Sequence, residues 1–134
     1  MEEDPDFELK ISATIHGEDF MPRKLLSMSK LIFDDCQEKG DEYVRKTHKG
    51  IHQSGLATLS VAVKSLSERN SQFDSLLAMI VDNYKAIKDS GGISISIWVA
   101  VFRSIQGNWE ATPEQIQKIA SFNGSLAVTY YREA

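Results

Sequence analysis

The sequence is poor in the residues that signal export, membrane insertion or covalent cross-linking. It contains a single cysteine, Cys36, so no disulfide can form within the chain. No apolar run approaches the roughly 20 residues that a helix needs to span a bilayer. No leader with a charged and then an apolar part precedes the first predicted strand. These features predict a cytoplasmic protein without a membrane partner.

Basic residues are too few for a typical nucleic-acid-binding surface. The chain has 15 lysine and arginine residues against 19 aspartate and glutamate residues, and its net charge at pH 7 is −4. Because nucleic-acid binders draw much of their affinity from clustered cations, we expect no nucleic-acid partner, and a basic partner suits the charge better. Hydrophobic residues make up 42% of the 134 residues. That share is enough for one domain, 1–134, with a buried core.

Alternation of apolar and polar residues predicts the main strands. Apolar residues recur at every second position from Phe7 to Ile15, from Ala57 to Val63 and from Leu126 to Tyr130. The segment 93–102 is apolar on both faces, which indicates a central strand.

Three segments carry helical signals. Pro22 suits the first turn of a short helix over about 22–31. From Phe73 to Ile87 the apolar residues fall on one helical face, and Gly91-Gly92 supply a left-handed terminus just beyond it. The run Thr112-Pro113-Glu114-Gln115 combines an N-cap, a first-turn proline and a capping-box glutamine.

The segment from Ile32 to Gly55 has no clear period. We place a short strand near 31–36, which continues as an irregular hairpin at 42–47. The predicted order is therefore β-α-β-β-α-β-α-β, a ferredoxin-like split β-α-β unit with an appended helix and strand. Right-handed crossovers then place the helices on one face of a largely antiparallel sheet, so the predicted class is α+β.

Short motifs along the chain occur together in a recognisable order. They are Ile11-x-x-x-Ile15-x-Gly17-Glu18-Asp19-x-x-Pro22, Lys39-Gly40-Asp41, Ile93-x-Ile95-x-Ile97, the helix start Pro113-Glu114 and the final strand Leu126-x-Val128-x-Tyr130. In this combination the chain resembles a family of small, mostly stand-alone bacterial domains known only as a domain of unknown function. The resemblance covers nearly the whole chain and implies a fold, but it implies no activity.

No group of residues predicts catalysis or a cofactor site. His48-x-x-x-His52 has the spacing of two metal ligands on one helical turn, but Gly50 lies between them and a third ligand is needed. We therefore expect solvated loop histidines and no metal. The acidic neighbours of Cys36 disfavour a reactive thiolate, and His16 is expected at a solvated strand end. The sequence predicts neither an enzyme nor a cofactor.

Acidic residues gather in two runs, one of which lies between Glu2 and Glu8. The other run consists of Asp34, Asp35, Glu38, Asp41 and Glu42. Such runs are commonly solvated surface. The alternative is a docking face for a basic partner, because complementary charge speeds encounter and selects against wrong partners.

Trp109 follows Gly107-Asn108 in a polar turn before a helix. An exposed tryptophan in such a turn would be an anchor for a protein partner. The other interpretation is that Trp109 folds back as a lid over the edge of the core. The sequence is consistent with both.

These features favour a non-catalytic protein-binding module. The most concrete hypothesis is an immunity protein that binds and neutralises a cognate bacterial toxin, such as a basic nuclease, because its size and charge are similar to those of immunity proteins. The predicted partner-binding residues are Asp34, Asp35, Glu38, Asp41, Glu42 and Trp109. The alternative is a small-molecule-binding or regulatory domain, with its ligand on the open sheet face or beside the long helix.

Overall fold

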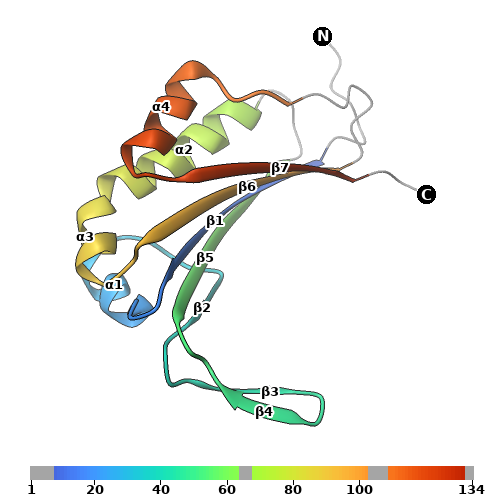
Figure 1. Cartoon of the computed structure of the whole chain (residues 1–134). Coiled ribbons are helices and arrows are strands. Elements are labelled where there is room, and N and C mark those ends of the chain that lie inside the picture. The colour runs from blue at the N-terminus through green and yellow to red at the C-terminus, as the bar shows by residue number, and fades with distance from the viewer. Residues whose placement is uncertain (1–7, 64–67, 103–108, 132–134) are drawn as a thin grey trace.

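The computed structural model describes residues 8–63, 68–102 and 109–131 (Figure 1). Within these residues, helices cover one face of a five-stranded sheet, and a two-stranded hairpin projects from one end of it (Figure 1). The predicted α+β class is confirmed.

The sheet has the strand order β2-β5-β1-β6-β7. Strand β1 (Glu8–Gly17) lies at its centre and pairs antiparallel with β5 (Gly55–Val63) and with β6 (Ser94–Phe102). Strand β2 (Asp35–Gln37) pairs antiparallel with β5, and β7 (Ser125–Tyr131) pairs parallel with β6. Strands β2, β5, β1 and β6 have the order of a ferredoxin-like unit, and one strand is added beside β6. The order of the main strands and helices along the chain is as predicted, whereas the strand order in the sheet comes from the structure alone.

The helices follow the predicted positions, with two corrections. Helix α1 (Pro22–Met28) ends before residue 31, because Ser29 takes an extended conformation and its hydroxyl donates to the Leu25 carbonyl at 2.7 Å. The segment predicted as one helix through Ile87 is broken into α2 (Arg69–Asp82) and α3 (Tyr84–Asp89).

The break falls at Asn83, which leaves helical geometry with φ −111° and ψ 12°. Its side-chain amide donates to the Met79 carbonyl at 2.8 Å. A side chain that bonds to the preceding turn competes with the helical backbone, and the apolar pattern does not report this. The predicted left-handed terminus is confirmed, because Gly91 has φ +97°.

Helix α4 (Pro113–Ser121) begins with the predicted capping box. The Gln115 amide donates to the Thr112 hydroxyl at 3.1 Å, and the Thr112 amide donates to the Gln115 side chain at 2.9 Å. The side chain of Gln115 also donates to Asp74 on α2, which ties the two helices together.

The middle segment differs most from the prediction. The strand expected near 31–36 is the shorter β2, and the hairpin expected at 42–47 is a separate two-stranded sheet of β3 (Glu42–Arg45) and β4 (His48–Ile51). Its turn contains Lys46 at φ +54°. The sequence there has no Asn-Gly or Asp-Gly pair, the usual signal for so tight a hairpin, and the alternation over four residues is too short to be recognised.

The core lies between the sheet and the helices. It is formed by the alternate residues of β1 that face the helices, by their neighbours on β5 and β6, and by the apolar faces of the helices. Its largest fully buried side chains include Phe20, Phe73, Phe122, Ile80 and Ile97. No helix covers the opposite sheet face (Figure 1), which carries serine and threonine residues together with Lys10, Trp98 and Tyr131.

Candidate protein-binding surface

The β3–β4 hairpin stands away from the body of the protein (Figure 1). Its two strands pair with each other from Glu42 opposite Ile51 to Arg45 opposite His48. They share no substantial contact with any other helix or strand in the described part of the chain. An isolated two-stranded hairpin is at best marginally stable in water. The fold therefore displays an element that its own core does not support.

One face of the hairpin is aromatic and basic. The Tyr43 ring lies against Gly50 on the opposite strand, so any side chain at position 50 would displace it. The Arg45 guanidinium lies 5.2 Å from the centroid of the Tyr43 ring, and the His52 ring lies 4.8 Å from it. His48 lies farther out, at 6.2 Å. Tyr43 thus organises the polar side chains of this face.

The other face of the hairpin exposes aliphatic side chains. Val44 is 65% exposed and Ile51 is 54% exposed, and both lie opposite the Tyr43 face. The register places Val44 and Ile51 as diagonal neighbours on one face, where a partner could cover both. An open hollow of about 630 Å³ follows this surface. It is lined by Glu42, Tyr43, Val44, Lys49, Gly50, Ile51 and Gln53.

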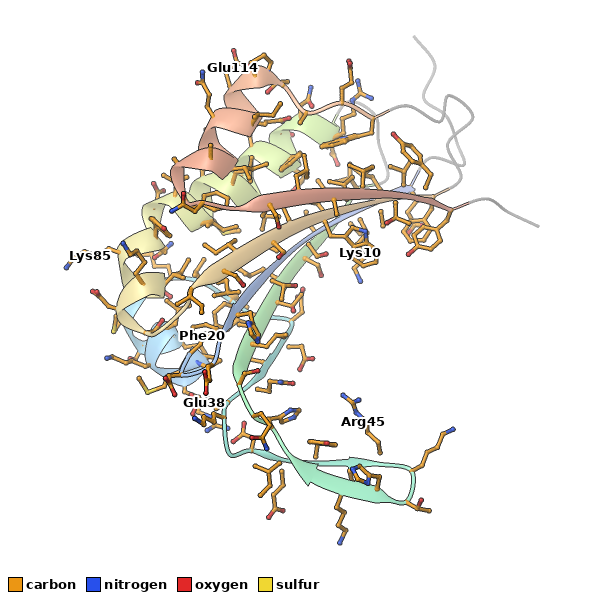
Figure 2. The ribbon with its side chains drawn as sticks, viewed as in Figure 1. Lys10, Phe20, Glu38, Arg45, Lys85 and Glu114 are labelled. Atoms are coloured by element: carbon orange, nitrogen blue, oxygen red, sulfur yellow. The ribbon has the colours of Figure 1, made fainter. Side chains whose placement is uncertain are left out.

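The charges divide between the base and the tip of the hairpin. The tip carries Arg45, Lys46 and Lys49, and the acidic residues predicted to bind a partner lie at or near the base. Figure 2 shows this separation: Glu38 lies beside α1, whereas Arg45 lies far out on the hairpin. The hairpin surface is therefore negative at or near its base and positive at its tip. The net charge of the chain does not show this separation of charge.

An ion-pair cluster fixes the base of the hairpin to α1. The Arg23 guanidinium donates to Glu38 Oε2 at 3.1 Å and to Asp41 Oδ2 at 2.9 Å. The Arg23 backbone amide also donates to Glu38 Oε1 at 2.9 Å, and the Glu38 amide donates to Asp41 Oδ2 at 2.9 Å. We call these three residues the Arg23 clamp.

The Arg23 clamp shifts the pKa values of Arg23 and Asp41. The Glu38 backbone amide, followed by the Arg23 side chain, lowers the pKa of Asp41 below its ordinary value, because both donate hydrogen bonds to the charged carboxylate. The hydrogen bond to Asp41, together with the negative charges of Asp41 and Glu38, raises the pKa of Arg23. The ion pair of Arg23 with Asp41 is therefore retained to a lower pH than the ordinary pKa of aspartate would allow.

The structure gives the five predicted acidic residues different roles. Glu38 and Asp41 are held in the Arg23 clamp. Asp34 accepts a hydrogen bond from the Ser60 hydroxyl on β5. Asp35 and Glu42 are exposed and form no ion pair with any described residue. Asp35 and Glu42 are thus the carboxylates best placed to meet a partner.

The interpretation of Trp109 as an exposed anchor is wrong, and the lid interpretation is confirmed. Its side chain is only 9% exposed and stacks on Phe73 of α2, with ring centroids 5.3 Å apart. Its backbone amide donates to the Tyr130 hydroxyl at 3.1 Å. Gly107 and Asn108 lie outside the described residues. The polar sequence around Trp109 does not show that the chain folds back onto α2, because that contact is long-range.

The residues considered for chemistry are dispersed. No three histidine, cysteine, aspartate or glutamate side chains in ranges 8–63, 68–102 and 109–131 are grouped so that they could hold a metal ion. His48 and His52 lie on a hairpin strand and beside it, next to Tyr43, and not on a helix. Cys36 is exposed on the edge strand β2, and His16 shares a 3.1 Å hydrogen bond with Ser54.

Sequence reasoning missed Arg23, Tyr43, Val44 and Ile51. The available signal was weak: Val44 and Ile51 are single aliphatic residues within a charged segment, and the pairing of Arg23 with Glu38 and Asp41 joins positions 15 and 18 residues apart. A hairpin was predicted at 42–47, but nothing in the sequence indicated that it forms a sheet of its own, apart from the main sheet.

Comparisons with models of protein families, with curated proteins and with solved structures found no match. The resemblance to the family of bacterial domains of unknown function therefore stays a prediction. Among the described residues, no helix has both the length and the apolar character needed to cross a membrane.

Proposed function

We propose that this chain is a non-catalytic protein-binding module whose main binding element is the β3–β4 hairpin. The supporting observation is an arm that exposes Val44 and Ile51 and makes no substantial contact with another helix or strand of the described structure. The Arg23 clamp holds the base of this arm, so that a partner meets a partly ordered element. Binding would supply the packing that the fold itself does not provide.

The shape of the hollow favours a protein partner over a small ligand. Small-molecule sites are concave and bury most of the ligand surface. Here the lining comes from the hairpin and from adjacent Gln53, with no residue from the helices or the main sheet. A small ligand would be covered on one side only. A small-molecule-binding or regulatory domain is the alternative to this proposal.

In its specific form, the proposed partner is a basic bacterial toxin, and the chain acts in the cytoplasm as its immunity protein. The net charge of −4 and the exposed carboxylates Asp35 and Glu42 support a basic partner. The cations Arg45 and Lys49 at the tip would meet acidic residues at the rim of that partner. Inhibition then needs only occlusion of the active groove of the toxin, and no chemistry by this chain.

The experiment first searches the genes beside that of this chain for a large secreted protein, and then expresses its C-terminal domain alone and together with this chain. Survival in the presence of the chain and a stable complex of the purified pair are the expected results. Ile51→Asp should weaken binding by about 30-fold or more, which corresponds to about 2 kcal/mol, because it places a charge in a desolvated contact. Ile116→Asp is the matched control, because Ile116 is 53% exposed on α4 against 54% for Ile51.

Two outcomes would contradict different parts of the proposal. Equal binding by the Ile51→Asp variant and the wild type would exclude the hairpin as the main element. A partner that binds but has no toxicity would exclude the immunity role and leave the binding module.

Asp35→Lys separates the electrostatic contribution to binding. This variant should slow association at low salt and much less at high salt, because exposed charges are screened.

A further inference from the structure

The two edges of the main sheet differ in how they are protected. Strand β2 forms one edge with only three residues, and Asp34 and Asp35 place exposed charges beside it. Strand β7 forms the other edge with the seven residues Ser125–Tyr131, which include no charged residue, proline or glycine. Natural proteins usually block an edge with charges, prolines or short strands, because an open edge templates another strand. The chain protects β2 in this way, whereas the described residues of β7 include none of these protecting features.

The outer edge of β7 pairs with no strand in the described part of the chain. It therefore presents a row of backbone donors and acceptors about 23 Å long, at about 3.3 Å per residue. The donors and acceptors of such a row pair with the backbone of an extended strand, and a helix or a small molecule cannot pair with them in this way. The occupant of this edge is thus an extended segment of chain.

The side chains of β7 form one apolar row and one small or hydroxyl-bearing row. Leu126, Val128 and Tyr130 lie on the helix side, where each remains partly exposed because the helices do not reach the edge. On the open side, Thr129 accepts a hydrogen bond from the Trp98 indole at 2.8 Å. The Tyr130 hydroxyl is held by the Trp109 amide. The strand is therefore ordered before any partner arrives.

We propose that two copies of this chain associate through β7, antiparallel about a two-fold axis at Val128, and form one continuous sheet. A two-fold interface must be self-complementary, and this register satisfies the requirement. Leu126 then lies opposite Tyr130 of the second copy on both sides of a central valine pair, and aliphatic–aromatic pairs across strands are favourable.

Charge also favours this edge for self-association. Two copies that each carry a net charge of −4 repel each other. The β2 edge would set Asp34 and Asp35 of both copies together, whereas β7 brings no charged residue of either strand into contact. The uncharged edge is where two copies approach with the least repulsion. The interface lies at the edge opposite β2 and does not depend on the proposed function of the hairpin.

The test is sedimentation equilibrium of the full chain over a wide range of concentrations. We expect the wild type to reach the mass of two chains. Val128→Lys and Val128→Glu should each remain at the mass of one chain, because the two-fold axis would place two side chains of the same charge directly opposite each other. Mixing these two variants should restore a one-to-one dimer. Val81→Lys is the matched control, because Val81 is 40% exposed on α2 against 37% for Val128, and it should dimerise as the wild type does.

Circular dichroism establishes whether each variant is folded. If Val128→Lys does not fold, Ala127→Lys on the other side of the same strand replaces it and should also give single chains. A wild type at the mass of one chain at every concentration would overturn the proposal. So would a dimer that Val81→Lys disrupts and Val128→Lys does not, or a mixture of the Val128→Lys and Val128→Glu variants that stays monomeric.

Discussion

At the scale of single residues, Arg23 joins α1 to the base of the hairpin. Its guanidinium contacts Glu38 and Asp41, which are two of the five acidic residues that the sequence assigns to a partner-binding face. A carboxylate held in this way is less available to a partner, because its hydrogen bonds are already made within the domain. The Arg23 clamp therefore turns part of the predicted binding face into a support for the hairpin.

The titration of Asp41 tests the Arg23 clamp. Its folded pKa is lowered, so the clamp contributes stability above the ordinary aspartate pKa of about 3.9 and loses it as the pH falls through the folded value. Arg23→Gln should raise the pKa of Asp41 only part of the way, because the Glu38 backbone amide still donates to the carboxylate. A carboxyl-carbon NMR titration of both proteins measures this. An identical Asp41 midpoint in the two would show that the ion pair is absent in solution.

At the scale of elements, the hairpin and the main sheet differ in what holds them together. Strand β1 is paired on both sides and buries Ile11, Ala13 and Ile15 under the helices. Among the described residues, strands β3 and β4 are held mainly by each other and by the Tyr43 ring against Gly50. Local opening requires little free energy where few buried contacts are lost.

Hydrogen exchange should separate the two elements. The amides that pair β3 with β4 should open with a free energy of about 0–2 kcal/mol, whereas those at the centre of β1 should require the global unfolding free energy, about 5–15 kcal/mol. Exchange followed by NMR at the amides of β3 and of Ala13 measures both values. Protection of the hairpin equal to that of β1 in the isolated chain would mean that the arm is not a marginal element awaiting a partner.

At the scale of the whole molecule, the hydrophobic core holds the main sheet and the helices together. Ile97 lies at its centre on β6 and is 1% exposed. Ile97→Ala should lower the free energy of unfolding by about 2–5 kcal/mol, because it removes buried methyl groups and leaves a cavity. Ile93→Ala is the control, because Ile93 is 79% exposed, and it should change stability by about 0.5 kcal/mol or less. Urea denaturation of the three proteins gives both differences, and equal midpoints would contradict the core assignment.

The sequence by itself determined the elements whose signals are local. The alternation in β1, β5, β6 and β7, the capping box at Thr112 and the terminus at Gly91 each depend on neighbouring residues, so they could be recognised without the fold. Together they were enough to predict the α+β class and the ferredoxin-like order. The break at Asn83 was missed, because the pattern of apolar residues is the same whether or not the Asn83 side chain bonds to the preceding turn.

Only the tertiary structure decided where the candidate site lies. Trp109 became part of the core through its contact with Phe73, a residue 36 positions earlier, and Arg23 reached Glu38 and Asp41 only because α1 lies beside the base of the hairpin. The exposure of Val44 and Ile51 likewise follows because no helix or strand of the described structure packs substantially against the hairpin. Such contacts join residues that are distant in the chain. Their formation depends on how the elements pack, and no local pattern of residues encodes it.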